Sequence, residues 1–187
     1  MKRFAMLLAA LLVSLPLSAL ELAGVKLGDT AQVGSQTLVL NGAGIRTKWF
    51  FKVYVGALYL PQKQADADMV IADEHSQRIA MYMLRDLGSK KLYGAFNEAI
   101  QANHNGAELK AMKAQLKQMA DIFNEIGEAK QGDVITLDYQ PASGTQISLN
   151  GKVFGNIEGD AFKRALLKIW LGSKPAQDDL KKAMLGG

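Results

Sequence analysis

The stretch from Leu40 to Pro61, which reads LNGAGIRTKWFFKVYVGALYLP, decides the fold of this chain. It is rich in aromatic and β-branched residues, which favour β-strands, and its final proline cannot continue a strand ladder. The Asn and Gly residues of 41–44 favour a tight turn. The sequence therefore predicts a long buried strand over Ile45–Leu60 that follows this turn and pairs with Thr37–Leu40.

One cation, Arg46, interrupts this apolar stretch. A guanidinium stays protonated in proteins and offers five donors, so its burial requires carboxylates or carbonyl oxygens as partners. Arg46 is therefore a candidate for binding the anionic head of a ligand. The alternative is an arginine that pairs with an Asp or Glu of a neighbouring element or is solvated, and spacing alone favours this more ordinary role.

Residues 1–19 have the pattern of a secretory signal peptide. Two basic residues precede an apolar run over Phe4–Leu15, and the small residues Ser18 and Ala19 follow. The run is shorter than the roughly 20 apolar residues that span a bilayer. An uncleaved anchor is the alternative. We expect a cleavable signal peptide, a mature domain over residues 20–187 and a location in the periplasm.

Charge and composition exclude several classes of function. Cleavage removes Lys2 and Arg3, which leaves 20 basic residues against 18 acidic ones. The lysines of 107–126 fall at helical spacing between apolar residues, which is typical of a solvated helix face rather than a nucleic-acid surface. The chain contains no Cys, so disulfides, thiolate metal sites and cysteine nucleophiles are excluded.

Common catalytic motifs are also missing from the sequence. It has no nucleophile elbow and no phosphate-binding loop. Its two histidines, His75 and His104, are far apart at predicted helix ends, so they do not form a metal-binding pair. We therefore expect no metal, no cofactor, no nucleic-acid partner and no integral membrane segment after signal cleavage.

The rest of the chain predicts one α+β domain. Apolar residues recur every three or four positions in the helical segments and alternate in the strands, and Asn150-Gly151 favours a two-residue hairpin turn. Ser89 is in position to cap a helix. The predicted elements are a short helix over Asp66–Asp73, a strand over Arg78–Leu84, helices over Ser89–Asn103 and Ala107–Ile126, antiparallel strands at 134–140, 145–150 and 152–158, and closing helices over Asp160–Leu171 and Ala176–Leu185.

A set of tyrosines accompanies Arg46 on this apolar background. A tyrosine near an arginine can support anion binding by donating its hydroxyl proton. Each tyrosine by itself is more simply a core aromatic whose hydroxyl reaches the surface. The candidates are Tyr54, Tyr59, Tyr82 and Tyr93.

The order of these motifs resembles the chalcone isomerase family. The resemblance rests on GAGIR followed by KVYVGALYLP, on the closing strands from QGDVITLDYQ to KVFGNIE, and on the SKPA entry to the final helix, and it spans residues 24–183. It implies an open-faced β-sandwich, in which a large antiparallel sheet carries a layer of helices with an apolar cleft between them. The family's plant enzymes cyclise chalcones to flavanones, and related members bind fatty acids in the same cleft.

The resemblance also assigns roles to individual residues. Arg46 matches the cleft arginine of the family. Tyr54 stands where the enzymes carry a threonine that polarises the substrate ketone and where fatty-acid-binding members carry a tyrosine. Tyr93 lies near the catalytic tyrosine on the family's helix, and Ile169 replaces a hydroxyl residue of the enzymes. These departures favour binding over cyclisation.

The sequence therefore predicts an exported binder of an apolar ligand with a carboxylate or carbonyl head, with Arg46, Tyr54 and Tyr93 as its ligand-binding residues. An isomerase or intramolecular lyase that acts on an enone is the rival, and it requires a second polar group facing Arg46. A module of an envelope assembly is a third possibility, and it requires a cleft filled by the protein's own side chains. Ligand identity and oligomeric state do not follow from the sequence.

Overall fold

The computed structural model describes residues 20–187, so the predicted signal peptide lies outside the described residues. A seven-stranded antiparallel sheet forms the centre, in the strand order β11-β10-β9-β6-β5-β4-β3. Its strands are β3 (Thr30–Val33), β4 (Gln36–Lys48), β5 (Phe51–Leu60), β6 (Gln77–Met83), β9 (Val134–Gln140), β10 (Gly144–Leu149) and β11 (Lys152–Ile157).

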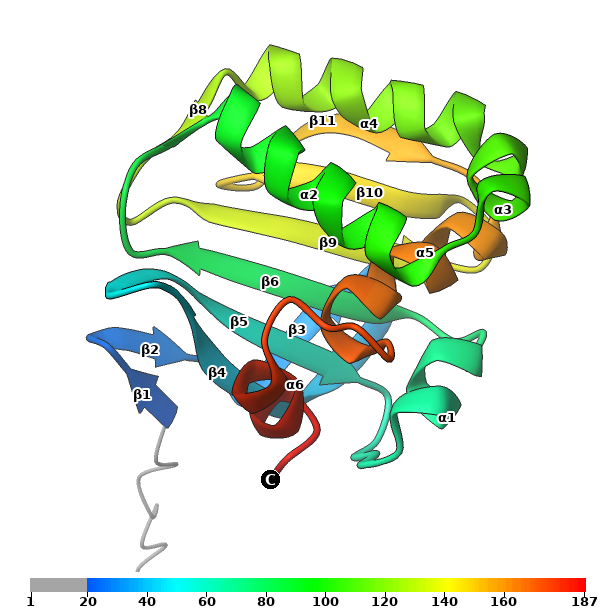
Figure 1. The fold of residues 1–187 in the computed structure, drawn as a ribbon. Helices are drawn as coiled ribbons and strands as arrows, with labels where there is room; N and C mark the ends of the chain where they lie inside the picture. Colours follow the sequence, from blue (N-terminus) through cyan, green and yellow to red (C-terminus); the bar gives the residue numbers. More distant parts are fainter. Residues whose placement is uncertain (1–19) are drawn as a thin grey trace, which may run out of the picture.

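Helices cover one face of this sheet (Figure 1). The longer ones are α2 (Ser89–Asn103), α4 (Lys113–Ile126) and α5 (Asp160–Leu171), and the shorter ones are α1 (Ala67–Ala72), α3 (Gly106–Ala111) and α6 (Asp178–Met184). Two small hairpins complete the fold: β1 (Leu20–Leu22) with β2 (Val25–Leu27), and β7 (Leu87–Gly88) with β8 (Glu128–Ala129). The α+β class and the open-faced arrangement predicted from the sequence are confirmed.

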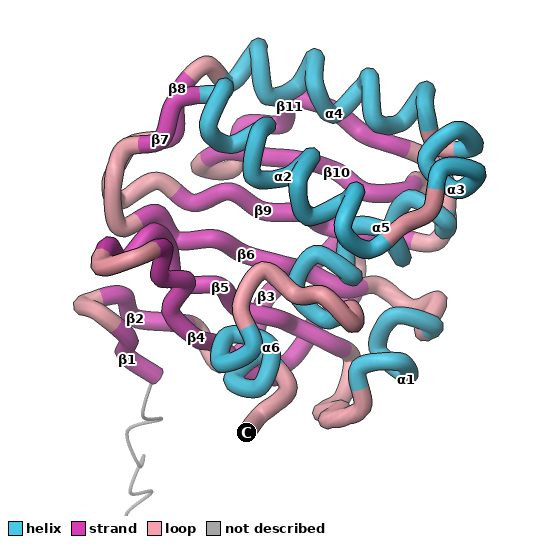
Figure 2. Tube along the Cα trace, viewed as in Figure 1, coloured by secondary structure: helices cyan, strands magenta, loops and turns pink. Residues whose placement is uncertain are grey.

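The two faces of the sheet enclose separate cores, because alternate residues of a strand point to opposite faces. On β5, Leu58 and Leu60 pack with the helices, whereas Ala57 and Tyr59 pack on the other face. The sheet curls around this second core, as Figure 2 shows. The carbonyl oxygen of Gln32 on β3 accepts a hydrogen bond from Arg78 on β6 at 3.1 Å, although β4 and β5 lie between these strands in the sheet.

The turn predicted at 41–44 is wrong. β4 continues through these residues, with an irregularity in its pairing at Asn41, and the chain reverses instead at Trp49 and Phe50. The glycines serve the packing of α6 rather than a turn. A Cβ on Gly42 would collide with the carbonyl oxygen of Ala183, and one on Gly44 would lie 2.8 Å from the Cβ of Ala183. Long-range packing therefore explains the glycines that resemble a turn signal in the sequence.

The side chain of Asn41 links β4 to Gln64 and to the end of α6. Asn41 lies at an irregularity in the pairing of β4 with β5 and is buried. Its Nδ2 donates to the carbonyl oxygens of Gln64 and Met184 at 2.9 and 2.8 Å, and its Oδ1 accepts from the backbone N–H of Gln64 at 2.7 Å. The end of α6 is thereby held against β4.

Most other predicted elements are confirmed within a few residues. Two details differ. The helix predicted over Ala107–Ile126 is divided into α3 and α4 at Met112, which has a non-helical backbone conformation. Ser89 lies inside α2, and Gly88 precedes the helix without a side-chain cap. The small strands β1, β2, β7 and β8 and the sheet strand β3 were not predicted.

Within residues 20–187, no helix is both long and apolar enough to cross a membrane. The same residues bring together no group of three or more His, Asp or Glu side chains of the kind that holds a metal ion.

Candidate functional site

A cavity of about 1010 Å³ lies between the sheet and the helical layer. Strands β5, β6, β9 and β10 form its floor, and α2, α4, α5 and the segment before α6 form its walls. Its apolar lining comprises Val53, Met81, Leu92, Phe96, Met119, Phe123, Ile135, Leu137, Ile147, Leu166, Ile169 and Trp170, among others. Such a lining suits an apolar ligand, and its volume is at the upper end of typical small-molecule sites.

Arg46 and Tyr54 line this cavity together. They are directly opposite each other on β4 and β5, so their side chains leave the same face of the sheet. The pairing becomes irregular immediately after Arg46. A bulge at such a point redirects side chains, and bulges are frequent next to functional sites. The structure thus unites two of the three residues predicted to bind a ligand.

The half-buried Arg46 has no carboxylate partner within the described part of the chain. Its Nη1 donates to the carbonyl oxygen of Thr47 and, at 3.2 Å, to Oε1 of Gln177. The same Oε1 accepts from the backbone N–H of Thr47 at 2.8 Å, so Gln177 holds the end of β4 next to the arginine. Only neutral oxygens of residues 20–187 contact Arg46, and its Nε and Nη2 donate to none of these residues.

The hydroxyl of Tyr54 accepts a hydrogen bond from the indole N–H of Trp170 at 2.9 Å. Burial raises the pKa of Tyr54, while the Trp170 hydrogen bond and the positive charge of Arg46 act in the opposite direction. The phenol is therefore neutral at physiological pH. Since its oxygen already accepts from Trp170, its own proton is available for an acceptor in the cavity, and residues 20–187 supply none.

Tyr93 is placed differently from the other two candidates. Its ring is 38% exposed on α2 and packs against Phe96 and Phe123, with ring centroids 6.4 and 6.3 Å away. It is not among the residues that line the cavity, whereas Phe96 and Phe123 are. The structure therefore places Tyr93 behind the cavity wall and does not bring it to Arg46.

The remaining tyrosine candidates belong to the opposite face. Tyr59 donates its hydroxyl proton to the carbonyl oxygen of Gly28 at 3.1 Å, and Tyr82 packs against the second core. Both follow the more ordinary interpretation, that of a core aromatic with a polar tip.

Several site residues were not found from the sequence. The sequence predicts Trp170 only as part of the helix Asp160–Leu171, without a role in the site. Gln177 lies in the loop before α6. The charged rim consists of Lys48, Arg85, Lys91 and Lys174, with Glu98 as the acidic member of the lining. Their positions scatter over the chain, so no local pattern links them. The one available signal for Trp170 is an indole N–H in a buried helix, which requires an acceptor.

Residues 19–186 match the chalcone isomerase-like family. The chain belongs to this family. Among solved structures, it is similar to a fatty-acid-binding protein from Arabidopsis thaliana, with a TM-score of 0.69 and 15% sequence identity. The similarity covers 90% of this chain and 96% of the Arabidopsis chain, so the two share the fold over nearly their whole length. No curated protein sequence matches the chain.

Proposed function

We propose that this protein binds an amphiphile with an apolar tail and a carboxylate or carbonyl head, of which a fatty acid is the simplest example. The observation that carries this proposal is Arg46, a half-buried cation without a protein carboxylate at the wall of a large apolar cavity. A desolvated guanidinium gains most from an anionic partner, and a ligand head group can supply one.

Tyr54 complements Arg46 in this role. A carboxylate has several lone pairs to satisfy, and it can accept from the guanidinium and from the tyrosine hydroxyl together. Because Trp170 donates to the Tyr54 oxygen, the hydroxyl proton points away from the indole. Arg46 therefore supplies charge, and Tyr54 supplies a neutral donor that serves acids and carbonyl compounds equally.

The apolar lining supports the other half of the proposal. Side chains from the sheet and from three helices face the cavity, and they exclude water from a ligand tail. The volume of about 1010 Å³ argues against a cleft filled by the protein's own side chains. The similar Arabidopsis fold belongs to a protein described as fatty-acid-binding, which is consistent with the same class of ligand here.

Binding is favoured over isomerase chemistry by the groups next to Arg46. On α5, the lining residues are Leu166, Ile169 and Trp170, and none of these is a base. Tyr54 with its raised pKa is a poor base at neutral pH. The site is built to hold an oxygen anion rather than to move a proton.

Replacing Arg46 with Met tests the proposal. The change keeps most of the volume of the stem and removes the charge. Affinity for oleate should fall by about 1.5–3 kcal/mol, the scale of a hydrogen bond to a charged group, and affinity for oleyl alcohol should fall less. Titration calorimetry of both ligands provides the measurement.

The matched control is Lys182→Met, an exposed cation on α6 that is not part of the cavity lining. It should leave both affinities unchanged. The free energy of unfolding of Arg46→Met should stay within about 1 kcal/mol of the parent, because no buried carboxylate is stranded. An Arg46→Met protein that binds oleate as tightly as the parent would refute the proposed head-group site.

A further inference from the structure

The tip of the β4–β5 hairpin presents three consecutive aromatic side chains to solvent. Trp49 is 84% exposed, Phe50 95% and Phe51 58%. The sequence predicted them inside a buried strand, and the structure corrects this. Exposed large aromatics in one run are costly in water, and such a patch marks an interaction site more often than an isolated apolar residue does.

The backbone of the tip is also unfavourable for its residues. Trp49 has φ +61°, in the left-handed region that bulky residues rarely adopt. The β10–β11 hairpin of the same sheet turns instead through Asn150 and Gly151, at φ +51° and +80°, which are the residue types that suit this conformation. The β4–β5 turn therefore carries a tryptophan where folding alone favours Asn or Gly.

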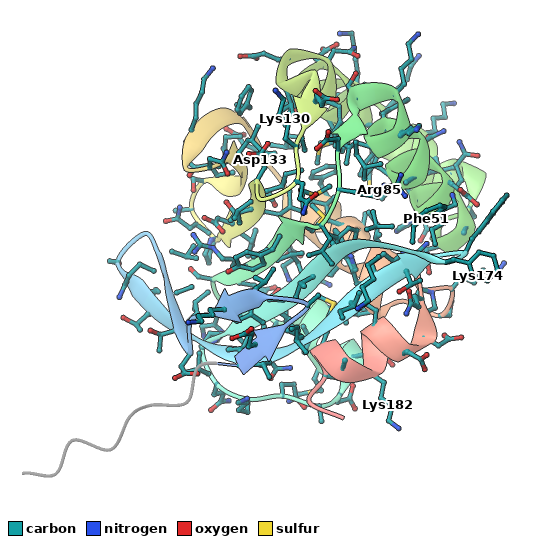
Figure 3. All side chains as sticks on the ribbon, turned by 90° about the vertical axis from the view of Figure 1, so that its left-hand side faces the viewer. Phe51, Arg85, Lys130, Asp133, Lys174 and Lys182 are labelled. Atoms are coloured by element: carbon teal, nitrogen blue, oxygen red, sulfur yellow. The ribbon has the colours of Figure 1, made fainter. Side chains whose placement is uncertain are left out.

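Cations surround the aromatic tip. Lys48 and Lys52 flank it in sequence, and the guanidinium of Arg85 lies 4.6 Å from the ring centroid of Phe51. Lys91 and Lys174 lie on the rim of the same cavity. Figure 3 shows Phe51, Arg85 and Lys174 on one side of the molecule. None of these five cations forms an ion pair with residues 20–187.

We propose that this hairpin tip docks the protein onto a lipid bilayer that contains anionic phospholipids. Tryptophan and phenylalanine are favoured at the membrane interface, where the rings leave water while lysine and arginine meet headgroup phosphates. Phe50, the most exposed of the three, is not part of the cavity lining and projects from the hairpin. The exposed aromatic side chains can enter the interface of an anionic bilayer while the neighbouring cations contact its headgroups.

Docking at this point brings the cavity to the bilayer. Trp49 and Phe51 belong both to the tip and to the cavity lining, and Lys48 and Arg85 also line the cavity. A ligand can then pass between the acyl-chain region and the cavity without crossing bulk water. This transfer step rests on the proposed function, whereas docking itself does not.

Trp49 reports on docking locally, because the only other tryptophan of the sequence, Trp170, is buried. The full chain is mixed with vesicles of phosphatidylcholine alone or with added phosphatidylglycerol, with and without brominated acyl chains. A Trp49→Phe variant provides the Trp170 signal for subtraction. We expect a blue shift and bromine quenching of Trp49 with the anionic vesicles, and a much smaller response with phosphatidylcholine.

Variants then locate the contact. The double change Trp49→Ser with Phe50→Ser should weaken partitioning to anionic vesicles by at least about tenfold, since two large aromatic surfaces are lost. Lys48→Gln with Lys52→Gln should weaken it by at least about tenfold and reduce its salt dependence. Vesicle flotation measures the partitioning of both double variants. Neither variant changes Phe51 or Arg85, so their cation–π contact is kept.

Matched controls come from the rest of the surface. Met69→Ser with Val153→Ser removes two other exposed apolar residues, and Lys110→Gln with Lys130→Gln removes two other exposed lysines. Both controls should bind as the parent does. Equal losses in the controls, or a Trp49 signal that ignores anionic vesicles, would overturn the proposal and leave the tip as a surface for a protein partner.

The two proposals fail in different ways. If docking is wrong but ligand binding is right, oleate binds while Trp49 does not respond to vesicles. If ligand binding is wrong but docking is right, Trp49 responds while oleate titration gives no heat.

Discussion

Two arginines on the central sheet have similar neighbours and different roles. Arg46 on β4 is paired across the strands with Tyr54, and Arg78 on β6 is paired with Tyr59. Arg78 lies on the face away from the helices, where its Nε and Nη2 meet the two carboxylate oxygens of Asp138 at 2.5 and 2.6 Å. Arg46 faces the cavity and meets neutral oxygens only.

The difference separates a structural ion pair from a candidate binding site. Arg78 has its anion built into the fold, and its hydrogen bonds to Asp138 raise its pKa further. The partners of Arg46, the carbonyl oxygen of Thr47 and Oε1 of Gln177, orient its guanidinium but carry no charge that would neutralise it. A cation in an apolar surrounding is unfavourable on its own, which is why the head-group site is proposed at Arg46 and not at Arg78.

The largest effect is expected from breaking the structural pair. Arg78→Met leaves the buried carboxylate of Asp138 without a partner, so the free energy of unfolding should fall by about 3–5 kcal/mol, or roughly 6–20 °C in Tm for a domain of this size. Calorimetric unfolding measures this. Arg78→Met combined with Asp138→Leu should recover much of the loss. A single variant as stable as the parent would remove the contrast with Arg46.

The second prediction concerns a variant that gives Arg46 a carboxylate partner of the kind that Arg78 has in Asp138. Gln177→Glu places a carboxylate 3.2 Å from Nη1 of Arg46 at the position of the present amide oxygen. The new carboxylate competes with the head group, so oleate affinity should fall by about 1.5–3 kcal/mol. Titration calorimetry provides the measurement, with Gln177→Ala as the control for simple loss of the amide. A Glu variant that binds oleate better than the Ala variant would contradict the role of Arg46.

A smaller effect is expected from Tyr54→Phe, which removes a neutral donor. Affinity should fall by about 0.5–1.5 kcal/mol, the net scale of one hydrogen bond, and by the same amount for oleate and oleyl alcohol. Arg46→Met should discriminate between the two ligands. Parallel titrations of both variants with both ligands test this difference. A Tyr54→Phe protein that loses only oleate would show that Tyr54 acts through charge.

The smallest effect concerns alkaline pH. Burial raises the pKa of both Tyr54 and Tyr59 in the folded state above the ordinary value of 10.0. Their contribution to stability is therefore fully present below pH 10 and is lost as the pH rises through the folded-state pKa values. Arg46→Met removes a charge that lowers the Tyr54 pKa, so this variant should lose more stability than the parent as the pH rises above 10. Urea unfolding at a series of pH values measures this.

The central hairpin shows where prediction from sequence succeeded and failed. Strand composition correctly predicted β-structure over the residues of β5. The predicted strand Ile45–Leu60 held both Arg46 and Tyr54, whereas the structure puts them on two paired strands, β4 and β5. The turn was misplaced because Gly42 and Gly44 look like turn residues, whereas α6, about 140 residues later in the chain, requires them. The aromatics of the tip were predicted to be buried, since composition does not distinguish an apolar strand from an apolar turn.

The sequence by itself determined the α+β class, the order of most elements, the family and the choice of Arg46 and Tyr54 as ligand-binding candidates. The class and the elements depend on local periodicity, and Arg46 was chosen because a cation is unusual in an apolar stretch. The family and the role of Tyr54 come from the resemblance in the order of motifs. The sequence also predicts export through residues 1–19, which stays a prediction.

Only the tertiary structure decided what surrounds these residues. It showed that Arg46 meets no carboxylate of residues 20–187, that Trp170 supports Tyr54, and that Tyr93 lies outside the cavity lining. It also showed that cations from distant segments line the cavity next to the exposed tip of the β4–β5 hairpin. The physical reason is that partners in a curled antiparallel sheet come from distant segments, and no local pattern records which of them meet.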